Sequence, residues 1–252
     1  MSVFTTHGFV LRAFPHKEAD LVVRLFTEEF GKMAGVAKGA RRPKSPMSGR
    51  FEILQLVEIK GYRSAHRELC SIDSASPLES FTSLRGSLEG FYRIHYVAEL
   101  LDLAFAEEGP HVEFFALVAR LLTLLEHDAV DPEMALRFLE LRLLEELGYG
   151  LSFGVCASCH ESNAPIVGFD PGEGGFVCET CLRALPEALR IGEQVVERLA
   201  RLWSASLTDL DSEVLPRALR RPLRQVGQRM LMYRLERPLR SARYLEEVEQ
   251  DA

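Results

Sequence analysis

The chain has 252 residues, of which 47% are hydrophobic and 27% are charged, and its formal net charge is −7. This composition excludes a disordered chain, because it supplies enough apolar surface for one or two domains plus a small module. No apolar stretch is long enough to span a bilayer, and the first residues lack a positive segment followed by an apolar run, so we expect a cytoplasmic protein.

The charges are sorted along the chain. Residues 31–50 contain six cations and no acid, and residues 217–243 contain nine arginines against Glu236 alone. Acids outnumber arginines between residues 89 and 146. Two basic clusters on an acidic body favour an anionic polymer as the partner, and a solvated basic face is the alternative for either cluster.

The first eighty residues show the alternating period of strands, with Pro15 separating the first two. We expect strands over residues 7–12, 20–27, 32–38, 51–60 and 69–72. About five short strands without an intervening helix pattern indicate a small barrel, with the OB-fold as the leading candidate. Cys70 stands alone in an alternating stretch, which favours a small buried hydrophobe.

The loop of residues 39–49 is rich in glycine, proline and cations. It does not match a phosphate-binding loop, because Lys44 follows Pro43, which has no amide hydrogen. A flexible basic connection instead suits contact with many backbone phosphates, without sequence specificity. Tyr62, beside Arg63 in an apparent turn, is the best candidate for stacking a base, with a place in the core as the alternative.

Beyond the strands the apolar period becomes that of helices. We expect helices over residues 81–105, 112–126, 132–147, 192–203 and 223–235. Asp131 followed by Pro132 predicts an N-cap with proline in the first turn, and Gly148 predicts a stop. Pro222 favours the start of the last helix.

The strongest chemical signal is a pair of C-x-x-C motifs, Cys156 with Cys159 and Cys178 with Cys181, separated by eighteen residues. Each motif places two thiolates on a tight turn, and this spacer lets them surround one ion. Four thiolates leave no open position, so we expect one structural Zn²⁺. A redox dithiol or disulfides remain alternatives, and His160 is an alternative ligand in place of a thiolate.

Catalytic signatures are thin, since the chain has no H-E-x-x-H motif and its histidines are scattered. Four segments nevertheless occur in a recognisable order. They are Ala37-Lys38-Gly39-Ala40-Arg41-Arg42, Leu147-Gly148-Tyr149-Gly150, the cysteine quartet, and Arg237-Pro238-Leu239-Arg240-Ser241. Their order resembles the RecO family of bacterial recombination and repair proteins over essentially the whole chain.

The resemblance implies an α+β fold, with an N-terminal OB-fold β-barrel followed by an all-α helical domain that carries an inserted four-cysteine zinc module. The expected bounds are residues 1–80 for the OB-fold, 81–152 and 183–252 for the two parts of the helical domain, and 153–182 for the zinc module. Some relatives lack the cysteines, so the resemblance does not make the metal essential throughout the family.

The resemblance also implies a non-catalytic, nucleoid-associated recombination mediator. Such proteins bind single- and double-stranded DNA, anneal complementary strands and, with RecR, help load RecA onto DNA coated by single-strand-binding protein (SSB). The expected DNA-binding residues are Lys38, Arg41, Arg42, Lys44, Arg50, Arg237, Arg240 and Arg243. We expect these cations to form one continuous surface.

Family members bind the acidic, apolar-ended tail of SSB through the helical domain. Arg137 and Arg142, taken as exposed beside an apolar groove, are the candidates for this contact, and pairing with Glu133 and Glu140 is the alternative. The rival hypothesis for the whole protein is a zinc-ribbon nucleic-acid enzyme or a redox-switched regulator.

Overall fold

The computed structural model describes residues 2–64, 69–106, 109–212 and 214–245. The chain divides into two compact units, a first unit of Met1–His127 with Leu239–Ala252 and a second unit of Asp128–Pro238. The α+β fold class is confirmed. The four predicted domain bounds stay predictions, and residues 246–252 of the last predicted segment lie outside the described residues.

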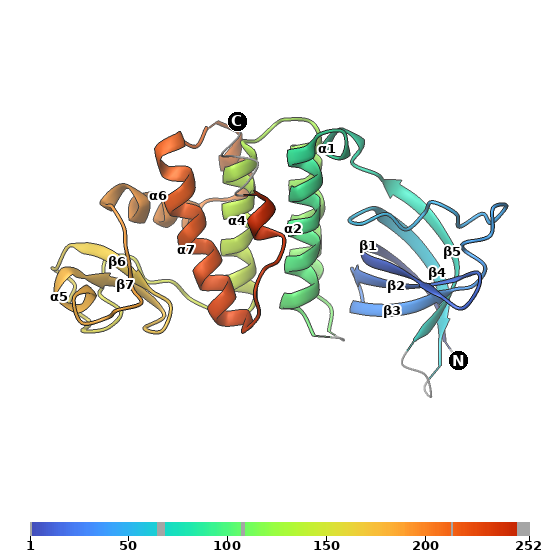
Figure 1. The fold of residues 1–252 in the computed structure, drawn as a ribbon, viewed down its shortest axis with the longest axis horizontal. Coiled ribbons are helices and arrows are strands. Elements are labelled where there is room, and N and C mark those ends of the chain that lie inside the picture. Colours follow the sequence, from blue (N-terminus) through green and yellow to red (C-terminus); the bar gives the residue numbers. More distant parts are fainter. Residues whose placement is uncertain (1, 65–68, 107–108, 213, 246–252) are drawn as a thin grey trace. The chain divides into compact units, whose positions relative to one another are not determined.

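Five strands of the first unit form a closed barrel, which Figure 1 shows in blue and cyan. The strands are β1 (Ser2–His16), β2 (Asp20–Thr27), β3 (Gly31–Ala37), β4 (Leu56–Arg63) and β5 (Cys70–Glu79). Their order around the barrel is β1-β2-β3-β5-β4, and β3 with β5 is the parallel pair that completes the closure. A five-stranded barrel of this kind confirms the expected OB-fold architecture.

Strand β1 is longer than expected because it pairs with two neighbours. Residues 2–9 pair with β4, and residues 8–16 pair with β2. The register shifts between Val10 and Arg12, and such a bulge turns a strand around a barrel corner. The prediction that Pro15 separates two strands is wrong, because Pro15 lies within the last residues of β1, where a missing amide donor is tolerated.

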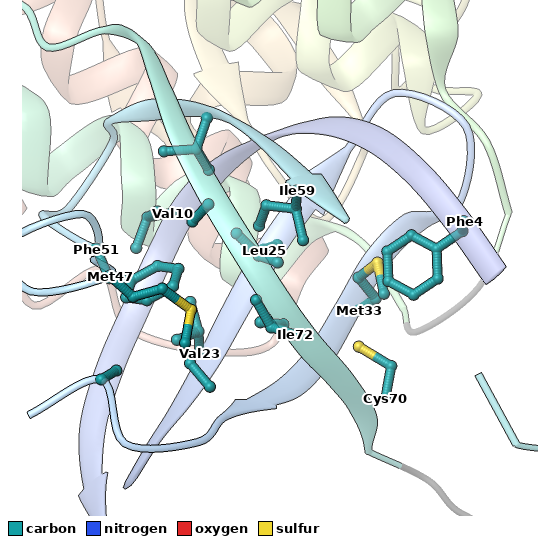
Figure 2. Close-up of a cluster of buried hydrophobic side chains, with 14 residues drawn as sticks. Phe4, Val10, Val23, Leu25, Met33, Met47, Phe51, Ile59, Cys70 and Ile72 are labelled. Carbon is teal, nitrogen blue, oxygen red and sulfur yellow. The ribbon is translucent and has the colours of Figure 1, made fainter. Parts of the chain in front are cut away.

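Apolar side chains from all five strands and from the loop between β3 and β4 fill the barrel. In Figure 2, Met47 and Phe51 of this loop lie together on one side of the cluster, and Phe4, Met33 and Cys70 lie on the other. Cys70 is 5% exposed, which confirms the prediction of a buried small hydrophobe. Burial raises the pKa of its thiol to about 11, so the thiol stays protonated and unreactive at neutral pH.

The helices of the first unit are α1 (Thr82–Arg85), α2 (Leu88–Ala104) and α3 (Val112–Glu126). The prediction for α3 is confirmed, but the single helix expected over 81–105 is wrong at its start. Ser87 accepts the amide hydrogen of Gly90 at 3.0 Å and so caps a new helix. The carboxylate of Glu126 accepts the first amide hydrogens of α1, which makes the short α1 a separate element.

The second unit contains α4 (Pro132–Glu146), α6 (Glu193–Ser204), the 3-10 helix η1 (Leu207–Ser212) and α7 (Arg217–Leu235). Asp131 accepts the amide hydrogens of Glu133 and Met134, both at 3.0 Å, which confirms the predicted N-cap of α4. Gly148 follows the end of α4 with φ of 81°, a left-handed conformation that suits glycine, and confirms the predicted stop.

Helix α7 begins six residues before the expected start, and Pro222 lies inside it. The sequence prediction is wrong here because ion pairs to α4 hold the helix on both sides of the proline. Arg220 lies 3.2 Å from Asp131, and Arg224 lies 3.1 Å from Glu133. Helices α4 and α7 pack side by side within this unit (Figure 1).

The segment around the cysteines forms a small sheet of order β7-β6-β8. Its strands are β6 (Ile166–Asp170), β7 (Gly175–Cys178) and β8 (Leu189–Arg190), and α5 (Glu179–Leu182) follows β7 directly. The spacer between the two C-x-x-C motifs is therefore a hairpin. Across the described ranges of the chain, no helix has the length and apolar character needed to cross a membrane.

Candidate metal centre and nucleic-acid interface

The four cysteine thiols of the two C-x-x-C motifs come together in the second unit. Their sulfur atoms all lie within 4.8 Å of one another. The end of β7 supplies Cys178 and α5 supplies Cys181, while the turn after residue 155 supplies Cys156 and Cys159. Cys156 and Cys178 are buried and Cys159 is exposed, so the cluster lies at the edge of the module with one thiol facing solvent.

Backbone amides support this cluster. The amide of Cys178 donates to the sulfur of Cys156 at 3.3 Å, and the turn is closed by the amide of His160, which donates to the carbonyl of Cys156 at 2.9 Å. Burial opposes the thiolate of Cys156, but amide donors, including that of Cys178, outweigh it and lower the pKa to about 6. The side chain of His160 is exposed and does not belong to the cluster.

The pKa of Cys181 is raised to about 12, first by its hydrogen bond to Cys159 and then by burial. Thiolates this close together repel one another, so the four thiols cannot all ionise without a cation between them. Four convergent sulfur atoms with amide donors suit a soft or borderline divalent ion. The cluster can therefore hold a metal ion, as the spacing predicts.

The basic loop, defined as residues 38–50, joins β3 to β4 in the first unit. Its side chains divide into two sets. Ala40 and Met47 are buried in the barrel cluster, as is Phe51 just beyond the loop. The exposed set contains Lys38, Arg41, Arg42, Lys44 and Arg50. The apolar set fixes the loop to the barrel, and the cations face solvent.

Hydrogen bonds give the basic loop a defined backbone, whereas the sequence indicates a flexible connection. Successive turns are closed by the amides of Arg42, Ser45 and Ser48, which donate to the carbonyls three residues before them at 2.9–3.1 Å. The amide of Gly39 donates to Asp20 at 2.8 Å. Within the described ranges, none of the five exposed cations makes an ion pair with an acid, so their charges stay available to a ligand.

The three predicted cations near the carboxyl end, Arg237, Arg240 and Arg243, are also exposed. Arg237 belongs to the second unit, and the other two belong to the first. The carboxylate of Glu99 accepts the backbone amide hydrogens of Arg240 and Ser241 at 3.0 and 2.8 Å. This contact holds the segment on α2 and leaves the side chain of Arg240 in solvent.

Most of the remaining arginines of the second basic cluster have partners inside the second unit. Besides the two ion pairs to α4, Arg229 donates to the carbonyl of Glu187 at 2.6 Å, and the guanidinium of Arg234 lies 4.4 Å from the ring centre of Tyr149. The count of nine arginines therefore overstates the positive surface that this part of the chain offers to a ligand.

Arg137 and Arg142 do not occupy the exposed positions that the sequence analysis assigned to them. The side chain of Arg137 is 1% exposed and lies 2.7 Å from a carboxylate oxygen of Glu140, so its expected exposure is wrong and the alternative of pairing with Glu140 is confirmed. Arg142, with a side chain 15% exposed, lies 2.7 Å from Glu145. The role of either residue in binding a tail stays a prediction.

Arg142 has a structural role that the sequence did not show. Its guanidinium lies 5.4 Å from the ring centre of Trp203 and donates to the backbone carbonyls of Leu202 and Trp203 in the last turn of α6. These carbonyls have no partner within the helix, so Arg142 acts as a C-terminal cap. This capping contact could not be predicted from the sequence, because it depends on α6 packing next to α4 and no local sequence pattern shows that packing.

Two family models match this chain. Recombination protein O N terminal matches residues 1–81, and Recombination protein O C terminal matches residues 85–243. The DNA repair protein RecO of Anaeromyxobacter sp. (strain K) is 33% identical over 245 residues, which cover 96% of this chain and 95% of that protein.

The DNA repair protein RecO of Acetivibrio thermocellus is 28% identical over 240 residues, 94% of each chain. The protein of that name from Symbiobacterium thermophilum is 28% identical over 249 residues, 98% of each chain. The chain therefore belongs to the RecO family and has a role in DNA recombination and repair.

Proposed function

We propose that this protein is a non-catalytic recombination mediator that binds single- and double-stranded DNA and anneals complementary strands. With RecR, it would help load RecA onto single strands coated by SSB, in the cytoplasm and at the nucleoid. Family membership supports the general role. The observation that carries DNA binding is the basic loop, where a folded backbone presents five exposed cations without a paired acid among the described residues.

The proposed mechanism is electrostatic. Each cation that contacts a phosphate releases condensed counterions, and this release drives binding to any DNA sequence. Two strands held on cationic surfaces repel one another less, so pairing proceeds without a chemical step. Arg237, Arg240 and Arg243 would add contacts to those of the basic loop. The expectation that all eight cations form one surface stays a prediction.

We propose that the cysteine cluster holds one structural Zn²⁺. Cys156, Cys159, Cys178 and Cys181 would supply all four ligands, which leaves no position for a reacting water. The ion would offset the mutual repulsion of the thiolates and join the turn after residue 155 to the end of β7. Its contribution would then be to the stability of the module, not to a reaction.

We further propose that the acidic tail of SSB binds the helical part of the chain. Of the two arginine candidates, Arg142 keeps partial exposure, whereas Arg137 is buried against Glu140 and would have to leave that pair to reach a ligand. Titration of an acidic peptide with an apolar carboxyl end should show weaker binding to an Arg142→Ala variant. Undiminished affinity would remove Arg142 from this role.

The main test is annealing of complementary oligonucleotides coated by SSB, without nucleotide. Arg41, Arg42 and Lys44 are replaced together by glutamine. The control replaces Arg183, Arg190 and Arg201, three exposed arginines of the second unit, and removes the same charge; Arg183 and Arg190 pair with Glu179. We expect the loop variant to anneal slowly and the control to match the wild type.

The same variants are compared for the salt dependence of duplex binding. Each lost phosphate contact lowers the slope of log K against log salt by about 0.9, so three lost contacts lower it by about 2.7. An unchanged slope would exclude the basic loop as the DNA site. Nucleotide hydrolysis or thiol turnover would instead support the rival enzyme or redox regulator.

A further inference from the structure

A cavity of about 730 Å³ lies in the first unit, where β1, β3 and β4 end and β5 begins. This volume falls within the range of about 300–1,000 Å³ that small-molecule sites occupy. The cavity is lined by Val36, Tyr62 and Cys70 and by the basic residues His16, Lys17 and Lys38, among others. Its lining therefore combines apolar and aromatic residues with cations.

Tyr62 is well placed to present a flat face to a ligand. It is half-buried, and its backbone pairs with Val3 of β1 on one side and with Ser71 of β5 on the other. A residue held in two strand pairings has little backbone freedom to lose when a ligand binds. Its neighbour Arg63 points to a different ring, with its guanidinium 5.4 Å from the centre of Phe30.

The lining of the cavity is connected to the basic loop. Asp20 lines the cavity and accepts the amide hydrogen of Gly39 at 2.8 Å, and the amide of Arg41 donates to the carbonyl of Ala19 at 2.9 Å. The turn between β1 and β2 is thus bound to the loop that carries the exposed cations. Neither Lys17 nor Lys38 makes an ion pair within the described part of the chain.

We propose that this cavity takes one unpaired base of a DNA single strand, stacked on Tyr62, while the flanking phosphates lie against Lys17 and Lys38. This inference rests on the proposed DNA binding and adds a selectivity to it. A base within a duplex is paired and stacked on both faces, so it cannot enter a cavity of this kind without leaving the helix. The basic loop binds both forms of DNA, and the cavity favours the unpaired one.

The test compares an oligothymidine with a duplex of equal length over a salt series. Stacking of one base on an aromatic ring is lost in Tyr62→Leu, and single-strand affinity should fall about 5- to 150-fold. The salt slope should stay unchanged because no phosphate contact is removed. Duplex affinity should also stay unchanged, and Tyr62→Phe, which keeps the ring, should bind both DNA forms like the wild type.

The two proposals fail in different ways. If Tyr62→Leu weakens single-strand and duplex binding equally, or weakens neither, the base-binding cavity is refuted and DNA binding by the basic loop stands. If the triple glutamine variant of the basic loop keeps the wild-type salt slope, the loop proposal fails. A retained duplex affinity of Tyr62→Leu also serves as the control that the barrel is folded.

A second measurement uses the unaltered protein and so does not depend on the folding of a variant. An oligothymidine with 5-iododeoxyuridine at single positions is bound and irradiated, and the modified peptide is identified by mass spectrometry. We expect an adduct on Tyr62 with the single strand and none on Tyr62 with the duplex. Adducts confined to residues outside the cavity would overturn the assignment.

Discussion

The substitution Gly227→Ala would test whether a close contact between α7 and α4 outweighs the higher helix propensity of alanine. The residue is buried in α7, and an added Cβ would collide with the Oε2 atom of Glu140 on α4. Alanine favours a helix interior by about 1 kcal/mol over glycine. Overpacking a filled site costs about 1–3 kcal/mol. Since Glu140 is itself buried beside Arg137, we expect Gly227→Ala to destabilise the second unit by about 1–2 kcal/mol.

The assay is urea unfolding followed by the emission of Trp203, the single tryptophan of the chain, which lies in the second unit. With a denaturant slope of about 2 kcal/mol per molar, the midpoint should fall by about 0.5–1 M. The companion variant Glu140→Asp shortens the carboxylate side chain by one carbon, so it should recover part of the loss when combined with Gly227→Ala. A midpoint raised by Gly227→Ala would refute the reasoning, since propensity alone would then decide.

Three further predictions concern other parts of the molecule. Burial opposes the charge of Glu126, but hydrogen bonds from the amides of Ser83 and Leu84 and the hydroxyl of Thr82 outweigh burial and lower the pKa of its carboxyl group. The carboxylate therefore stabilises the fold above the unfolded pKa of about 4.3. This stabilisation is lost as the pH falls through the lower pKa of the folded protein. The unfolding midpoint of Glu126→Gln should therefore lie below that of the wild type at pH 7, and the two should converge as pH falls below the unfolded pKa of Glu126. A difference that does not change with pH would contradict this. Purified protein should carry one zinc ion, and chelation should lower the midpoint of urea unfolding followed by Trp203 emission. The salt dependence of DNA binding should stay the same, because the basic loop belongs to the other unit. A weaker salt dependence after chelation would contradict a purely structural ion. Arg142→Leu should lower the free energy of unfolding by about 1–2 kcal/mol, because it removes the cation–π contact and the helix cap. The control Arg201→Leu changes an exposed residue of α6 and should alter the free energy of unfolding by less than about 0.5 kcal/mol. Equal effects of the two substitutions would show that the cap contributes little.

Features specified by neighbouring residues were predictable from the sequence. The alternation over Asp20–Thr27 and the helical period over Val112–Glu126 give the observed bounds of β2 and α3. The C-x-x-C spacing likewise predicts the convergence of the four thiols, since each motif needs only its own turn and one hairpin. The exposure of the loop cations follows from their lack of apolar periodicity.

Features specified by distant residues were not predictable in this way. Pro15 and Pro222 are local breakers, yet strand pairing and the ion pairs to α4 keep each inside a regular element. The sequence pattern around Arg137 is that of a surface cation, but its side chain is buried against Glu140, which itself lies against Gly227 of α7. No sequence period distinguishes a buried ion pair from an exposed one, because both place charges at helical spacing.

The return of residues 239–245 to α2 has a consequence for synthesis of the protein. Leu239, Ala242 and Leu245 bury their side chains in the first unit, although all of the second unit is translated before them. A nascent chain that has left the ribosome only as far as His127 still lacks residues 239–245 of the first unit. The amino-terminal unit therefore reaches its final form last, after the part of the polypeptide inserted within it has emerged.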